Sequence, residues 1–125
     1  MDPLSETEQR VAGIDIFSVM EAFMLELRPS CEHCNVALPA NSPHALICSF
    51  ECTFCAQCVD QVLANVCPNC GGGFAPRPVR PAHIDVGGNT LSANPMSTAV
   101  RHRPVDPQKH ALLVAAVGAI AAQNR

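Results

Sequence analysis

The sequence predicts a small α+β module, built from a short β-hairpin and one helix, with a helical segment on each side. Three observations lead to this fold class. All eight cysteines of the 125 residues lie between Cys31 and Cys70. Within that stretch, short apolar runs typical of two strands precede apolar residues at helical spacing. The chain has five Phe and no Trp or Tyr, so a conventional core has little material and bound metal must supply much of the stability.

The cysteine spacing is typical of two four-thiolate metal sites. Three of the intervals are C-x-x-C pairs, and such a pair lets two thiolates reach one Zn²⁺ at about 2.3 Å from a single turn. Eight thiols fill two tetrahedral sites with none left over, so the sequence predicts two Zn²⁺ and a module that unfolds when they are removed. The predicted ligands are Cys31, Cys34, Cys48, Cys52, Cys55, Cys58, Cys67 and Cys70.

A disulfide framework is the first alternative, because an even number of cysteines also cross-links small secreted proteins. Residues 1 to 23 argue against it. They carry five acidic side chains against one arginine, the opposite of a cationic signal-peptide start, and no long apolar stretch follows. We therefore expect a reduced, cytoplasmic protein.

Residues 1–28 are predicted to form an N-terminal amphipathic helix. Ser5 and Glu8 have the spacing of a capping box, and Pro29 ends the helical pattern. The apolar positions recur at three- and four-residue steps and are Val11, Ile14, Phe17, Met20, Met24 and Leu27. Such a stripe is typical of an ordinary packing surface, and a partner-binding helix is the alternative.

Residues 29–81 are the predicted two-zinc module, and a hairpin opens its ordered part. Residues 45 to 47 have the character of a short strand that leads into Cys48. Thr53 and Phe54 belong to a second strand, which returns alongside the first.

A helix is expected from Cys58 onward, because the apolar residues that follow fall on one face and would cover the space between the two sites. Its apolar positions are Val59, Val62, Leu63 and Val66. Gly71 permits the positive φ that a chain often needs as it leaves a C-x-x-C turn, and Gly72 and Gly73 are expected to end the ordered packing.

Residues 82–105 are predicted to be a flexible, proline-rich connector, and residues 106–125 an apolar C-terminal helix. Asp106 and Pro107 suit the cap and the first turn of that helix. The apolar run is too short to span a bilayer, which needs about twenty residues, yet its uniform hydrophobicity demands burial. We expect it to dock on the N-terminal stripe or on a second copy of the chain; disorder until it meets a partner is the alternative.

The order of the cysteines resembles that of a RING finger. In that family a C-x-x-C pair, a longer loop, two more ligands, a second C-x-x-C pair and a final C-P-x-C follow one another, and Cys67-Pro68-Asn69-Cys70 fits the last of these. The resemblance implies a RING-like cross-brace with two quartets. These are Cys31, Cys34, Cys55 and Cys58 on one zinc, and Cys48, Cys52, Cys67 and Cys70 on the other.

Residues 24 to 81 look more specifically like the small bacterial domain of unknown function 1272. The segments that carry the likeness are Met24-Leu25-Glu26-Leu27-Arg28-Pro29, Cys48-Ser49-Phe50-Glu51-Cys52-Thr53-Phe54-Cys55, Cys67-Pro68-Asn69-Cys70-Gly71-Gly72, Arg77-Pro78 and Arg80-Pro81. Met24 falls about where a member of that family is expected to begin. The resemblance implies metal binding and the fold, and it leaves the biological role open.

Ubiquitin-ligase activity, the first extension from a RING pattern, is disfavoured at three positions. His33 precedes the second ligand, where such RINGs usually have an apolar residue, and Gly71 follows the last ligand, where they usually have a cation. Cys52 stands where the fourth ligand is typically His. Closed thiolate shells leave no free nucleophile and no open position for water, so no catalytic or cofactor-binding residue is assigned. His33 and His44 lie near the sites as hydrogen-bonding groups, substitute ligands or surface residues.

The expected role is a structural scaffold for protein–protein interaction or self-association. One alternative is a redox- or zinc-responsive thiol sensor. Another is an iron–sulfur electron-transfer protein, because Cys48, Cys52 and Cys55 have the spacing of a [4Fe–4S] triad. The formal net charge of −3, about −7 with two zinc ions and eight thiolates, disfavours nucleic acid as a partner. The arginines expected to offset the anionic centres are Arg28, Arg77 and Arg80.

Overall fold

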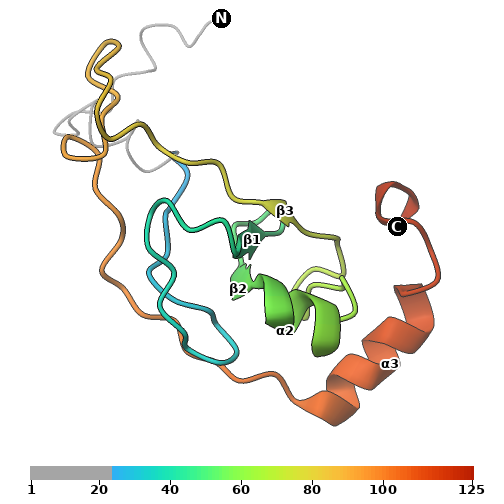
Figure 1. The fold of residues 1–125 in the computed structure, drawn as a ribbon. Coiled ribbons are helices and arrows are strands. Elements are labelled where there is room, and N and C mark those ends of the chain that lie inside the picture. Colours follow the sequence, from blue (N-terminus) through green and yellow to red (C-terminus); the bar gives the residue numbers. More distant parts are fainter. Residues whose placement is uncertain (1–23) are drawn as a thin grey trace, which may run out of the picture.

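The structure, a computed structural model, describes residues 24–125 and shows a small α+β fold (Figure 1). The elements in chain order are β1 (Ala45–Ile47), β2 (Thr53–Cys55), α2 (Ala56–Gln61), β3 (Ala75–Pro76), α3 (Pro107–Val117) and the 3₁₀ turn η1 (Ala122–Asn124). The three strands and α2 lie together at the centre, and the chain that follows β3 runs around them to α3. The predicted fold class, a small α+β module, is confirmed.

The predicted hairpin is present and supplies two strands of a three-stranded antiparallel sheet of order β2-β1-β3, in which β1 is the middle strand. In the β1–β2 pair, Leu46 lies opposite Phe54. On the other side of β1, Leu46 lies opposite Pro76. The sequence analysis missed β3, because it expected the two glycines at 72 and 73 to end the ordered packing. A two-residue strand that contains proline carries no periodic signal of its own.

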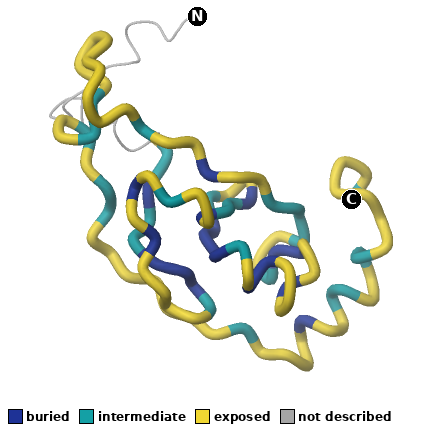
Figure 2. Tube along the Cα trace, viewed as in Figure 1, coloured by how far each residue is buried: buried dark blue, intermediate teal, exposed yellow. Residues whose placement is uncertain are grey.

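The hydrophobic core lies between the sheet and α2, and cysteines make up much of it. Its largest fully buried apolar side chains are Phe54, Leu27 and Leu63. The ring of Phe54 meets that of Phe74 edge to face, with centroids 5.5 Å apart. Six of the eight cysteines are buried. Figure 2 shows the buried residues gathered in this central part and an exposed outer chain.

Helix α2 begins earlier and ends sooner than predicted. Cys55 occupies its N-cap and Cys58 lies within its first turn, whereas the apolar pattern suggested a start at Cys58. The chain leaves the helix through Ala64 and Asn65, whose φ values of 52° and 57° are left-handed. The expected apolar positions Val59, Leu63 and Val66 are buried, and Val62 is exposed.

The C-terminal helix is capped as predicted, and one of its residues is buried against the module. Asp106 accepts hydrogen bonds from the backbone N–H of Gln108 and Lys109, and proline follows the cap. The helix ends at Gly118 rather than continuing through the apolar run. His110 is its one buried residue, whereas Leu112 is 74 % exposed. Within the described residues only the edge of α3 that carries His110 meets the module, and the predicted burial on the N-terminal stripe or on a second copy of the chain stays a prediction.

The predicted N-terminal helix lies almost entirely outside the described residues, and so does the docking of the C-terminal helix on its stripe. Its last positions, 24 to 27, are described and are not helical. Their backbone bonds distant groups instead: the N–H of Glu26 donates to Glu51 Oε1 at 2.9 Å, and Leu27 O accepts from the N–H of Ser97 at 2.9 Å. These long-range contacts use the groups that a helix would need.

Candidate metal centre

The first cysteine cluster joins two segments that are far apart in sequence. Cys31 and Cys34 lie on the loop before β1, Cys55 ends β2, and Cys58 lies in α2. The four Sγ atoms are all within 4.8 Å of one another. The cluster therefore draws the loop onto the junction of β2 and α2.

The sulfur separations of this cluster suit a tetrahedral metal ion. The Sγ atoms of Cys34 and Cys55 are 3.8 Å apart. Four sulfurs at about 2.3 Å from a central Zn²⁺ would lie about 3.8 Å from one another, which is the same separation. A disulfide needs an S–S distance of about 2.05 Å, so these two thiols are free.

The second cluster brings together three sulfurs, with the fourth predicted ligand close by. Cys48, Cys67 and Cys70 have Sγ atoms within 4.8 Å of one another, and Cys52 is not within that distance of all three. The Cys52 thiol still lies against those of Cys48 and Cys67, and it accepts a hydrogen bond from Asn69 Nδ2 at 3.3 Å. The structure thus provides one group of four cysteines and one of three, each of which could hold a metal ion.

The loops that carry the first and last C-x-x-C pairs are built alike. In the first pair loop, residues 31–36, the N–H of Cys31 donates to Val36 O and Cys31 O accepts from the N–H of Asn35, both at 2.9 Å. In the last pair loop, residues 67–72, the same two bonds recur at Cys67 at 2.8 Å. The residue after the second cysteine has positive φ in both loops, 64° at Asn35 and 77° at Gly71. The positive φ predicted for Gly71 is confirmed.

Backbone N–H groups point at four of the sulfurs. The N–H donors are those of Cys34 to Cys31 Sγ, Phe50 to Cys48 Sγ, Asn69 to Cys67 Sγ and Gly72 to Cys70 Sγ, at 3.3–3.5 Å. Such bonds favour a thiolate over a thiol. Burial acts to raise the pKa of Cys31, but its backbone donors outweigh burial and the pKa is lowered.

At Cys58 and Cys67 burial and the crowding of sulfurs raise the pKa of the thiol, whereas the pKa of Cys31 is lowered. Burial first, and then the neighbouring cysteines, raise the pKa of both thiols far above the ordinary value of 9.0. Several thiolates packed together repel one another, so the clusters cannot ionise fully without a nearby positive charge. A divalent cation supplies that charge, and the donor set therefore fits a metal ion.

Each cluster has one cysteine at the surface. Cys34 of the first and Cys70 of the second are exposed, whereas the other six are buried. The clusters thus lie at the edge of the core, and each has one exposed cysteine residue.

The sequence analysis missed Glu32, the buried carboxylate between the first two cysteines. It is 2 % exposed. Its Oε2 accepts from the N–H of Thr53 at 2.7 Å and from Arg28 Nη1 at 2.7 Å, and its Oε1 lies 3.5 Å from Arg103 Nη2. Glu32 therefore fixes the first pair loop to β2. The feature of the sequence that could have indicated this role is the position of a charged residue between two predicted ligands.

The three arginines near the cysteines make structural hydrogen bonds and ion pairs that the sequence did not predict. The buried Arg77 donates to the carbonyl oxygens of Arg28 at 2.8 Å, Leu38 at 3.2 Å and Pro39 at 2.8 Å. Arg28 binds Glu26 and Glu32, and Arg80 donates to Asn94 O and Leu25 O. These guanidinium groups join backbone segments and carboxylates, and their predicted role in offsetting the charge of the two centres stays a prediction.

Of the two histidines near the clusters, one is engaged and one is at the surface. His33 Nδ1 accepts from the N–H of Val105 at 2.9 Å. The side chain of His44 is exposed. Neither belongs to the sulfur groups within the described part of the chain.

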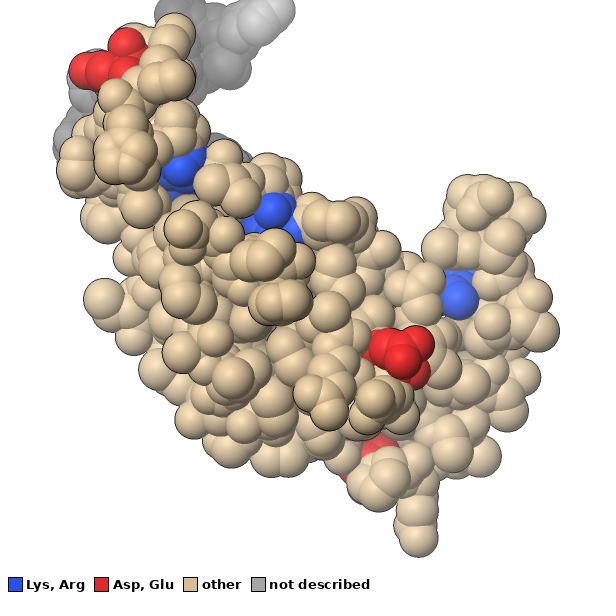
Figure 3. Space-filling view, in the orientation of Figure 1, with Lys and Arg blue, Asp and Glu red and all other residues tan. Residues whose placement is uncertain are grey.

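Charge on the visible surface is sparse. On the face shown in Figure 3, Lys and Arg side chains are isolated from one another, and Asp and Glu are interspersed. That face offers no basic stripe for a phosphate backbone. From residue 24 onward, no helix is long and apolar enough to cross a membrane.

These features define a class of protein: a small α+β module with a three-stranded sheet and two cysteine clusters that could bind metal. Residues 24–80 match the family described as "Protein of unknown function (DUF1272)". A curated relative, the uncharacterized protein R02474 of Rhizobium meliloti (strain 1021), is 51 % identical over 85 residues, which are 68 % of this chain and 90 % of the relative. The chain belongs to this family, as the sequence resemblance indicated. No solved structure matches it.

Proposed function

We propose that the protein is a two-zinc structural module in which the metal ions interleave the chain as a RING-like cross-brace. The two quartets are Cys31, Cys34, Cys55 and Cys58, and Cys48, Cys52, Cys67 and Cys70. The observation that carries the proposal is the first cluster, whose four sulfurs lie within 4.8 Å of one another, with one pair at 3.8 Å. Four thiolates around one ion are the donor set of structural zinc sites.

A structural role follows from the closed ligand set. Zinc held by four thiolates has no open position at which to activate water, and the sulfurs it binds are not free as nucleophiles. The protein is therefore proposed to be a non-enzymatic scaffold for a protein partner in a reduced, cytoplasmic setting. The positions that set this chain apart from RINGs that bind a ubiquitin-conjugating enzyme, such as Gly71 after the last ligand, support a role other than ubiquitin transfer.

Native mass spectrometry of the full chain tests the proposal. We expect a mass increase that corresponds to two zinc ions per chain, a colourless protein, and loss of the folded circular-dichroism spectrum after chelation. A single bound metal contradicts the two-quartet arrangement. Brown colour with broad absorbance near about 410 nm identifies iron–sulfur chemistry instead.

A thiol sensor is the second candidate, favoured by the exposure of Cys34 and Cys70. A peroxide molecule that reaches the first cluster would take two electrons from two thiolates, such as the neighbouring Cys34 and Cys55. Those two sulfurs form one disulfide, the peroxide takes up two protons to give two waters, and Zn²⁺ is released. Release of zinc at low peroxide, with rebinding after thiol reduction, would identify a sensor; zinc retention would leave the static scaffold.

A further inference from the structure

The last residues of the connector contact the first pair loop between its two cysteines. We call residues 101–125 the C-terminal strap. The N–H of Arg103 donates to Glu32 O at 2.7 Å, and the N–H of Val105 donates to His33 Nδ1 at 2.9 Å. Val105 also packs against the core. The strap is thus attached at the loop that carries Cys31 and Cys34.

The far end of the strap contacts the last pair loop and the turn before it. His110, which is buried, donates from Nε2 to Leu63 O at 2.8 Å. Arg125 Nη1 donates to Asn65 O at 2.9 Å and to Gly71 O at 3.2 Å. Gly71 directly follows the last cysteine, so the strap touches the ligand loops of both clusters.

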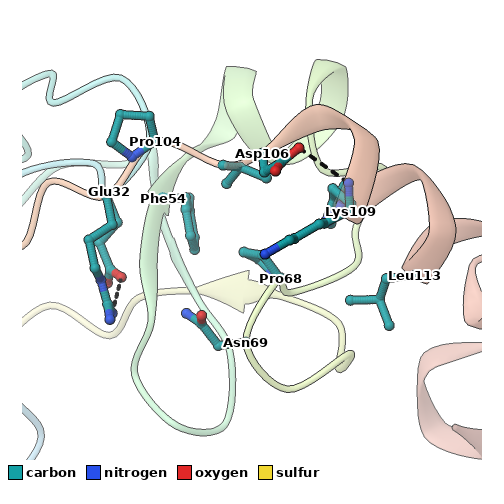
Figure 4. Close-up of a pocket in the computed structure, with 11 residues that line it drawn as sticks. Glu32, Phe54, Pro68, Asn69, Pro104, Asp106, Lys109 and Leu113 are labelled. Carbon is teal, nitrogen blue, oxygen red and sulfur yellow. Dashed lines mark hydrogen bonds and ion pairs between the residues drawn. The ribbon is translucent and has the colours of Figure 1, made fainter.

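The surface on which the strap rests is only partly filled. A cavity of about 230 Å³ lies between the strap and the module. Figure 4 shows Glu32, Phe54 and Asn69 on the module side of it, and Asp106 and Lys109 on the strap side. Close packing is therefore limited here, and the strap depends on hydrogen bonds to loop atoms. Those bonds form only while the loops keep their shape.

We propose that the strap and the metal ions hold each other in place. The inference rests on the proposed function, because it needs ions in the clusters. Metal fixes the two pair loops and so presents the carbonyl groups and the histidine nitrogen that the strap binds. By thermodynamic reciprocity, a bound strap stabilises the loops in their metal-holding shape and strengthens metal binding. Because affinity differences lie mostly in the dissociation rate, the stronger binding should appear as slower metal loss. Metal removal frees the strap, and with it the apolar helix α3.

One matched pair of variants tests the effect of the strap on metal release. Val105→Asp places a carboxylate against the core and should detach the strap. Val100→Asp makes the same change at a position that is 60 % exposed, in the same part of the chain. In the full zinc-loaded protein, transfer of zinc to a coloured chelator should be at least about fivefold faster for Val105→Asp than for Val100→Asp, the low end of typical coupling between two sites. Equal rates would overturn the proposal.

A second pair of variants covers the case in which Val105→Asp does not fold. His110→Ala removes the bond to Leu63 O, and Leu112→Ala truncates a 74 % exposed side chain on the same helix. Zinc transfer should be faster for His110→Ala alone. If both release zinc at the rate of the unchanged chain, the strap does not retain metal.

Hydrogen exchange of backbone amides measures how bound metal affects the strap. The amides of α3 (Pro107–Val117) should be protected in the zinc-loaded chain and exchange freely after chelation. Equal protection in both states would contradict the proposal. Native mass spectrometry on the same samples distinguishes failure of the proposed function from failure of this inference. If no zinc is bound, the proposed function fails. If two zinc ions are bound but the exchange of the α3 amides does not depend on them, only this inference fails.

Discussion

Glu32 Oε2 accepts the backbone N–H of Thr53 at 2.7 Å, and this bond fixes the loop of the first cysteine pair to the first residue of β2. The carboxylate is buried, and its charge is balanced by Arg28, whose Nη1 is 2.7 Å away. Two residues later β2 supplies Cys55 to the first cluster. Glu32 therefore helps to set the distance between the two halves of that site.

Replacement of Glu32 by glutamine should destabilise the zinc-loaded fold by about 3 kcal/mol. The amide can still accept from Thr53, but it removes the buried counter-charge of Arg28 and leaves only the partly exposed Glu26 beside it. Urea unfolding followed by circular dichroism at fixed free zinc measures the change. Asp60→Asn, at an exposed acidic position, is the matched control and should change stability by less than about 0.5 kcal/mol. Equal urea midpoints of unfolding for the two variants would show that the Glu32 carboxylate does not stabilise the fold.

Arg77→Met should destabilise the fold by about 3 kcal/mol, because three carbonyl oxygens lose a charged donor while the apolar stem is kept. Arg101→Met is the control: its guanidinium bonds Glu26 and its side chain is 42 % exposed. Thermal unfolding of both zinc-loaded variants checks the difference. A melting temperature for Arg77→Met as high as that of the control would contradict the structural role.

Cys52→Ser should reduce the bound zinc from two ions to one. Cys52 lies against Cys48 and Cys67, and the proposed second quartet needs it as the fourth ligand. Ser49→Ala, at an exposed position in the same hairpin loop, should keep both ions. Native mass spectrometry measures the number of zinc ions bound per chain. Two ions retained at unchanged affinity in Cys52→Ser would mean that another group completes the second site.

Zinc affinity should rise with pH across the neutral range. Burial and the neighbouring cysteines raise the pKa of Cys58 and Cys67 above the ordinary 9.0, so without metal these thiols carry protons at neutral pH. Zinc must expel the protons, and this becomes easier as pH increases towards those pKa values. Calorimetry in buffers of different ionisation enthalpy should detect proton release on binding. Affinity that is independent of pH would mean that the thiols are already ionised.

The local features could be predicted from the sequence because they depend on residues that are close along the chain. The hairpin follows from two short apolar runs around Cys48 and Cys52, and the cap of α3 follows from Asp106 and Pro107. The positive φ of Gly71 follows from its place after a C-x-x-C pair. The number and spacing of the cysteines also predicted that the thiols would gather into clusters, because few other structures would place eight cysteines in so short a stretch of sequence.

The tertiary structure alone decided which distant groups meet. Arg77 reaches the carbonyl of Arg28, 49 positions earlier, and Arg103 reaches Glu32, 71 positions earlier. No periodic pattern encodes such contacts, because they arise only after the sheet and the cysteine loops have brought the segments together. The exposed face of α3 has the same cause. The hydrophobicity of the sequence predicted that this helix would be buried, but the path of the chain around the module brings only the edge with His110 into contact with the module.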